Sequence, residues 1–86
     1  MAIRKFETSV EELLTILAEE CAELIQEIMK MKRKNNYSSS KFTDEAADVL
    51  LMLQLCRDKD LGMKEEDIQA RFKVKREKLK QWSRLL

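Results

Sequence analysis

The chain has 86 residues, no proline, one glycine and 38% charged side chains. This length supports a single domain, residues 1–86, near the small end of what one hydrophobic core stabilises. Proline and glycine, which usually punctuate strands and turns, are almost absent, and strong helix formers dominate, so the composition excludes a β-rich fold. The expected class is all-α, with long helices and short connections.

Charge and residue types restrict the chemistry. The formal net charge is only +1, but acidic residues are concentrated in the first half and basic residues between Arg71 and Arg84. The chain has no histidine, which removes the usual general base, the usual zinc ligand and any Ser–His or Cys–His nucleophile pair. Carboxylates without His or Cys clusters favour hard cations, Mg²⁺ first and Mn²⁺ as an alternative.

Three features indicate a cytoplasmic setting without a membrane partner. The longest strictly apolar run, Val49 to Leu53, is far shorter than a membrane span. The N-terminal residues Met1 to Lys5 lack the apolar stretch of a secretory signal. Cys21 and Cys56 lie within helical apolar patterns, so we expect reduced core residues and not a disulfide framework.

The first helix is expected to begin near Thr8 or Ser9, because each is followed three residues later by a glutamate, which is the capping-box spacing. Apolar residues then recur at steps of four and three: Val10, Leu14, Leu17, Cys21, Leu24, Ile28 and Met31. This period predicts a helix of several turns. It should end between Lys32 and Asn35, before a short serine-rich connection.

The second helix is expected from about Lys41 to Lys59, and its middle, residues 46–56, is apolar on nearly every face. A helix that is apolar all round is buried on all sides. In so short a chain, this predicts either a central helix or burial against a second subunit.

The third helix should follow Gly62, which is a helix stop signal, and begin with the acidic triplet at residues 65–67. We expect it to direct four side chains inward, with a basic face outward: Ile68, Phe72, Leu79 and Trp82. The three helices predict an antiparallel bundle that is completed by oligomerisation.

Two pairs of acidic residues occupy positions where a structural role alone would favour apolar side chains. Glu20 and Glu23 follow two apolar residues by one heptad, and their i, i+3 spacing places their Cβ atoms about 5–6 Å apart on one face. Glu45 and Asp48 repeat this spacing, and Asp48 interrupts the most apolar segment. If the two helices pack antiparallel, four carboxylates meet and need a neutralising cation, for which Mg²⁺ is suited.

Other interpretations remain open. A Glu pair at i, i+3 is usually a solvated helix edge, and then the chain is a non-enzymatic helical interaction protein. On that interpretation, four further glutamates are mostly surface charges, with Glu19 as an exception because it neighbours the pair: Glu11, Glu12, Glu19 and Glu27. A nucleic-acid partner for the basic helix is disfavoured, because the acidic first half would repel phosphates. A di-iron bundle is disfavoured because its Glu-x-x-His motifs need histidine.

The segment Glu19-Glu20-Cys21-Ala22-Glu23, followed after 21 residues by Glu45-Ala46-Ala47-Asp48, resembles the EExxE…ExxD pattern of MazG-like pyrophosphohydrolases. The resemblance extends roughly from Leu13 to Trp82. It implies an all-α, four-helix core and the metal-dependent hydrolysis of a nucleoside triphosphate to a monophosphate and pyrophosphate. It also implies a homodimer or a homotetramer.

The resemblance also assigns roles to the acidic residues. The magnesium ligands would be Glu20, Glu23, Glu45 and Asp48. Glu19 would be an additional ligand or the group that orients the attacking water, so Glu19 and Glu20 are the expected catalytic residues.

Family members have a Lys-rich third helix, often with an Asn between the Lys and a later Arg. The matching positions here are Lys73, Arg76 and Lys80, which would hold the substrate phosphates, whereas Glu77 stands where the Asn is expected. The nearest alternative is a phosphoribosyl-ATP pyrophosphohydrolase, which has similar acidic motifs. The Lys-rich segment beyond Phe72 favours the MazG-like assignment.

Overall fold

The computed structural model describes residues 8–86 and contains three helices: α1 (Ser9–Lys34), α2 (Ser40–Asp58) and α3 (Glu65–Trp82). No strand occurs in this part of the chain, which confirms the all-α class. Residues 1–5, where we expect no secretory signal, lie outside the described residues. Between residues 8 and 86, no helix is both long and apolar enough to cross a membrane.

Local capping explains where α1 begins and ends. Thr8 is the N-cap, and its Oγ1 accepts a hydrogen bond of 3.0 Å from the backbone N–H of Glu11. At the other end, Asn35 adopts a left-handed conformation with φ of 50° and donates its N–H to the carbonyl oxygen of Lys32. Asparagine tolerates this conformation better than most residues. Both bounds agree with those expected from the sequence.

The start of α2 is tied back to α1 by Ser39. The Oγ of Ser39 caps α2 by accepting a hydrogen bond of 3.2 Å from the N–H of Phe42, and it donates one of 2.9 Å to Oε1 of Glu27. Glu27 is only 7% exposed, so its expected place on the surface is wrong. Its burial is tolerated because it lies on the side of α1 that faces the connection, where the hydroxyl satisfies the carboxylate.

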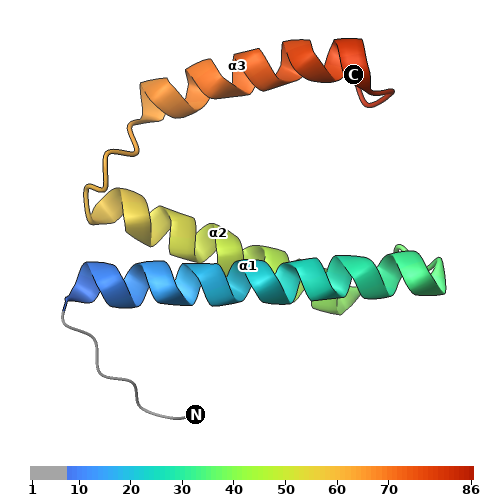
Figure 1. Ribbon diagram of the computed structural model, residues 1–86, viewed down its shortest axis with the longest axis horizontal. Helices are drawn as coiled ribbons and strands as arrows, with labels where there is room; N and C mark the ends of the chain where they lie inside the picture. Colours follow the sequence, from blue (N-terminus) through green and yellow to red (C-terminus); the bar gives the residue numbers. More distant parts are fainter. Residues whose placement is uncertain (1–7) are drawn as a thin grey trace.

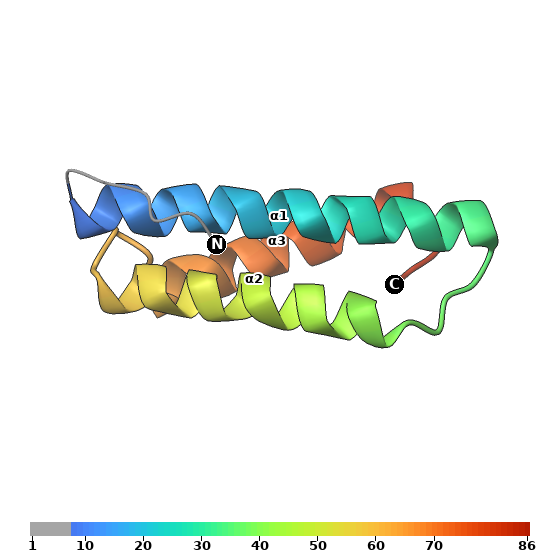
Figure 2. The same ribbon diagram turned by 90° about the horizontal axis from the view of Figure 1, so that it is seen from below.

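The helices α1 and α2 form an antiparallel hairpin (Figures 1 and 2). Its apolar core is small, because Leu13 and Cys56 are the only apolar side chains that are buried among residues 8–86. Cys56 belongs to this core, whereas Cys21, also expected there from the sequence, is only half-buried. The opposite face of α2 remains in solvent, with Leu50 66% and Leu51 54% exposed. Residues 8–86 of a single chain therefore leave much of the all-round apolar α2 uncovered.

The third helix stands apart from the hairpin (Figure 1). Every Cα atom of α3 lies more than 8 Å from every Cα atom of α1 and α2. An ion pair of 2.7 Å between Arg57 and Glu65 links the end of α2 to the start of α3. The expectation that Phe72 and Trp82 point into the chain's own core is wrong, since both are exposed, Trp82 by 84%. Among residues 8–86, no other helix packs against this face of α3.

Candidate metal centre

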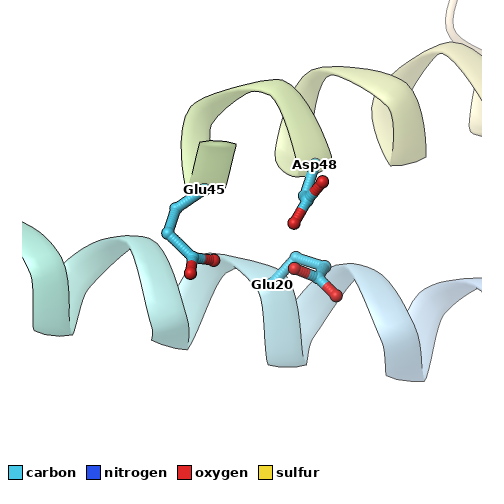
Figure 3. Close-up of side chains that lie close together, drawn as sticks. All are labelled: Glu20, Glu45 and Asp48. Atoms are coloured by element: carbon cyan, nitrogen blue, oxygen red, sulfur yellow. The ribbon is translucent and has the colours of Figure 1, made fainter. Parts of the chain in front are cut away.

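The antiparallel packing of α1 and α2 brings three carboxylates together across the helix interface. Glu20 comes from α1, and Glu45 and Asp48 come from successive turns of α2. One oxygen from each side chain lies within 4.8 Å of the other two. Figure 3 shows Glu45 and Asp48 pointing from α2 toward α1, and Glu20 pointing back toward them. The site is thus built from two rigid helices and not from a loop.

Two oxygens of this cluster lack any partner. Oε2 of Glu20 and Oε2 of Glu45 are both buried, and neither accepts a hydrogen bond. A buried carboxylate oxygen without a donor is costly, because it loses its hydration without compensation. The donor set consists of hard oxygen atoms only, which suits a small divalent cation such as Mg²⁺. The residues present therefore fit a metal ion.

Electrostatics in the cluster agree with this interpretation. Burial raises the pKa of the Glu20 carboxyl above its ordinary value, and the charges of Glu23 and Asp48 raise it further. Burial also raises the pKa of the Glu45 carboxyl. The interaction with Glu23 and the charge of Asp48 raise it further, whereas the charge of Lys41 lowers it. The acids thus destabilise one another's ionised forms, and a bound cation would relieve this repulsion.

Two other sequence-predicted acids flank the group of three. Glu23 is exposed, and its interaction with Glu45 raises the pKa of the Glu45 carboxyl. It lines an adjoining hollow together with Glu45. Glu19 is half-buried on α1, next to Glu20 in the sequence, and is outside the group whose oxygens lie within 4.8 Å.

The structure does not bring the predicted phosphate-binding cations to these carboxylates within one chain. Lys73, Arg76 and Lys80 line a separate hollow of about 330 Å³ on α3. Lys80 is paired with Glu77 at 3.2 Å. Because no Cα atom of α3 lies within 8 Å of any Cα atom of α1 or α2, these cations lie outside the carboxylate cluster of their own chain.

A second group of cations lies much nearer and was missed from the sequence. Lys30 and Lys41 line the hollow of about 260 Å³ that also contains Glu23 and Glu45. A sequence pattern does place these lysines near the acids. Glu27, Lys30 and Lys34 continue the stripe of Glu20 and Glu23 along the first helix at steps of four and three. The burial of Glu27 depends on Ser39, which returns from the connection and is not a helix neighbour.

A helical hairpin with clustered carboxylates from both helices offers oxygen ligands of the kind that a divalent cation prefers. The family model of the MazG nucleotide pyrophosphohydrolase domain matches residues 8–81. The chain therefore belongs to the MazG family, and its family activity is nucleotide pyrophosphohydrolysis. No curated protein and no solved structure matches the chain.

Proposed function

We propose that this chain is a metal-dependent nucleoside triphosphate pyrophosphohydrolase that converts a (d)NTP and water to a (d)NMP and pyrophosphate. The observation that supports this most is the cluster of Glu20, Glu45 and Asp48 at the helix interface, with two buried oxygens that lack donors. Membership of the MazG family supports the same reaction class.

The acidic residues would have two roles, binding the metal ion and activating the attacking water. Glu20, Glu45 and Asp48 would hold Mg²⁺, or Mn²⁺ as the alternative, with Glu23 as a further ligand from the adjoining turn of α1. When bound, the ion would neutralise charge on the phosphate oxygens and activate water. Glu19 would orient the attacking water and accept its proton, since it is next to Glu20 on the same helix.

The proposed assembly is a homodimer or a homotetramer in a cytoplasmic setting, with sites near subunit boundaries. Exposed apolar side chains on α2 and α3, among them Leu51 and Phe72, would then be covered by another chain. In such an assembly, Lys73, Arg76 and Lys80 of one chain would bind phosphate oxygens at the metal centre of another.

The test is pyrophosphate release from a panel of ribo- and deoxyribonucleoside triphosphates and phosphoribosyl-ATP, with and without Mg²⁺. We expect release from a triphosphate that requires the metal and falls by about 10³-fold or more in Glu20→Gln, since a catalytic metal supplies several kcal/mol. Glu66→Gln, an exposed position at the start of α3, is the matched control and should keep wild-type activity. Release without metal, or equal release by Glu20→Gln and Glu66→Gln, would reject the proposal. A preference for phosphoribosyl-ATP would instead identify the activity as phosphoribosyl-ATP pyrophosphohydrolysis.

A further inference from the structure

The interface between α1 and α2 changes the sign of its charge along its length. On α1 the stripe that faces α2 runs, at steps of three and four residues, through Glu20, Glu23, Glu27, Lys30 and Lys34. On α2 the matching stripe runs, at steps of four and three, through Lys41, Glu45 and Asp48. Residues at these spacings share one helix face. The acids therefore meet in the middle of the hairpin, and the lysines gather at its closed end.

Two adjoining hollows connect the acidic and basic ends of this stripe. The first, of about 260 Å³, is lined by Glu45 from the carboxylate cluster, by the neighbouring Glu23, and by Lys30 and Lys41. The second, of about 240 Å³, lies at the connection and also contains Lys30 and Lys41, with Lys34 beyond them. Figure 3 shows that Glu45 lies on the side of the carboxylate cluster toward the C-terminal part of α1. Lys30 and Lys41 thus border both hollows, next to the proposed metal site.

The three lysines form no short ion pair within the described residues, although the charge of Lys41 lowers the pKa of Glu45. Between residues 8 and 86, none of the ion pairs within 4.0 Å involves Lys30, Lys34 or Lys41, although Glu27 lines the same hollow. Glu27 instead accepts its hydrogen bond from Ser39 and is buried. The ammonium groups are therefore available to an anion in the hollow.

The same hydrogen bond ties together the two segments that contain these lysines. Ser39 links Glu27 on α1 to the first turn of α2, because its hydroxyl also accepts from the N–H of Phe42. Lys30 lies one turn beyond Glu27, and Lys41 lies two residues after Ser39. Lys30 from α1 and Lys41 from α2 thus border one hollow, each close to the Glu27–Ser39 hydrogen bond.

We infer that Lys30 and Lys41, with Lys34, form a binding subsite for the two terminal phosphates of the substrate, which leave as pyrophosphate. The inference rests on the proposed function for the identity of the substrate. The carboxylates and their cation would hold the phosphate chain at one end of the hollow, and the lysines would neutralise the distal phosphates at the other. A nucleoside monophosphate lacks these phosphates, so the subsite favours the substrate over that product. It also supplies phosphate-binding cations from the same chain as the metal ligands, independently of α3.

A simpler role for the basic residues at the end of α1 is to complement the helix dipole, which favours cations in the last turn. Lys32 and Lys34 both lie in that turn, but only Lys34 lines the hollow. Lys32→Gln therefore removes the same charge from the same turn without touching the subsite, and it is the matched control.

The test is the binding of inorganic pyrophosphate to the full chain in the presence of Mg²⁺, measured by titration calorimetry. In the double variant Lys30→Gln/Lys41→Gln, we expect the dissociation constant to rise by about 10- to 100-fold, as for the loss of charge-assisted hydrogen bonds. Lys32→Gln should bind within about twofold of the wild type by the same arithmetic. Lys30→Arg/Lys41→Arg should restore binding, because it restores the two positive charges. The KM for the triphosphate should rise in parallel with the dissociation constant.

Each outcome separates the subsite from the reaction. Pyrophosphate binding that is unchanged in the double variant, with normal turnover by the wild type, would overturn the subsite and leave the proposed function intact. Binding that the double variant loses, in a wild-type chain that hydrolyses no nucleotide, would support the subsite and reject the function. No binding by the wild type, or equal losses in Lys32→Gln, would also overturn the subsite. Thermal melting of each variant shows that it is folded.

Discussion

The α1–α2 hairpin and α3 differ in how far one chain completes them. In the hairpin, side chains cap the start of both helices, and three carboxylates meet across the interface. By contrast, α3 has no side-chain cap at its N-terminus and packs on neither neighbour. An isolated helix of 18 residues is only marginally stable in water, and most helices in proteins depend on tertiary packing.

The contrast separates the helices that contain the proposed site from the helix that depends on assembly. The hairpin contains the chemistry, since both its proposed metal ligands and the lysines of the proposed subsite come from α1 and α2. The exposed apolar side chains of α3, such as Phe72 and Val74, need a cover that residues 8–86 of one chain do not supply. We therefore expect the hairpin to tolerate changes that leave its interface intact, and α3 to depend on assembly.

The largest expected effect is on assembly, and it comes from Leu51→Glu on the exposed face of α2. Burying a leucine contributes about 1.5–3 kcal/mol per chain, and a symmetric dimer would lose this twice. The dimer dissociation constant should rise by about 10²-fold or more, which light scattering over a range of concentrations would measure. Leu51→Met conserves volume and should assemble normally. A monomeric wild type, or an unchanged molecular mass for Leu51→Glu, would contradict the claim that assembly covers the exposed face of α2.

A smaller effect is expected inside the hairpin, from Ser39→Ala. The substitution removes the N-cap of α2, worth about 1 kcal/mol, and leaves a buried oxygen of Glu27 without its donor, which costs about 1–3 kcal/mol. The free energy of unfolding should therefore fall by about 2 kcal/mol or more in a urea titration. Ser40→Ala changes an exposed neighbour and should cost much less. Equal losses in the two variants would show that the hydrogen bond to Glu27 adds nothing.

The smallest expected effect is a pH dependence of stability. Because the folded state raises the pKa of Glu20 and Glu45, it binds their protons more tightly than the unfolded state does. Without divalent metal, their contribution to stability should thus increase as the pH falls through the raised pKa values toward the ordinary value of 4.5.

The matched comparison for this pH dependence is Glu20→Gln, whose thermal melting temperature should gain less on acidification than that of the wild type. Added Mg²⁺ should reverse the wild-type trend, because the cation binds the ionised carboxylates. If the melting temperatures of Glu20→Gln and the wild type differ by an amount that depends on neither pH nor Mg²⁺, repulsion among the carboxylates is contradicted.

Helix content and position followed from local features of the sequence. The spacing of Thr8 from Glu11 and the left-handed Asn35 set the bounds of α1, and both depend only on near neighbours. The acids at positions 20 and 48 were conspicuous because they interrupt apolar stripes, and the antiparallel hairpin brings them together with Glu45.

The remaining features depend on partners distant in the sequence. Glu27 looked like a surface charge, because its burial requires Ser39, twelve residues away, to supply a hydroxyl. The apolar period of α3 showed that Phe72 and Trp82 need a cover, but a helical period cannot say whether the same chain or another one provides it. The assignment of metal ligands stays a prediction.

The most direct test of the central claim is a titration of the chain with Mn²⁺, followed by the electron paramagnetic resonance of the free ion. We predict that the wild type removes Mn²⁺ from solution and that Mg²⁺ competes for the same site. Asp48→Asn, which retains shape but removes one ligand charge, should bind Mn²⁺ at least about tenfold more weakly, and Glu66→Gln should bind like the wild type. Equal binding by Asp48→Asn and the wild type would contradict a metal centre formed by Glu20, Glu45 and Asp48.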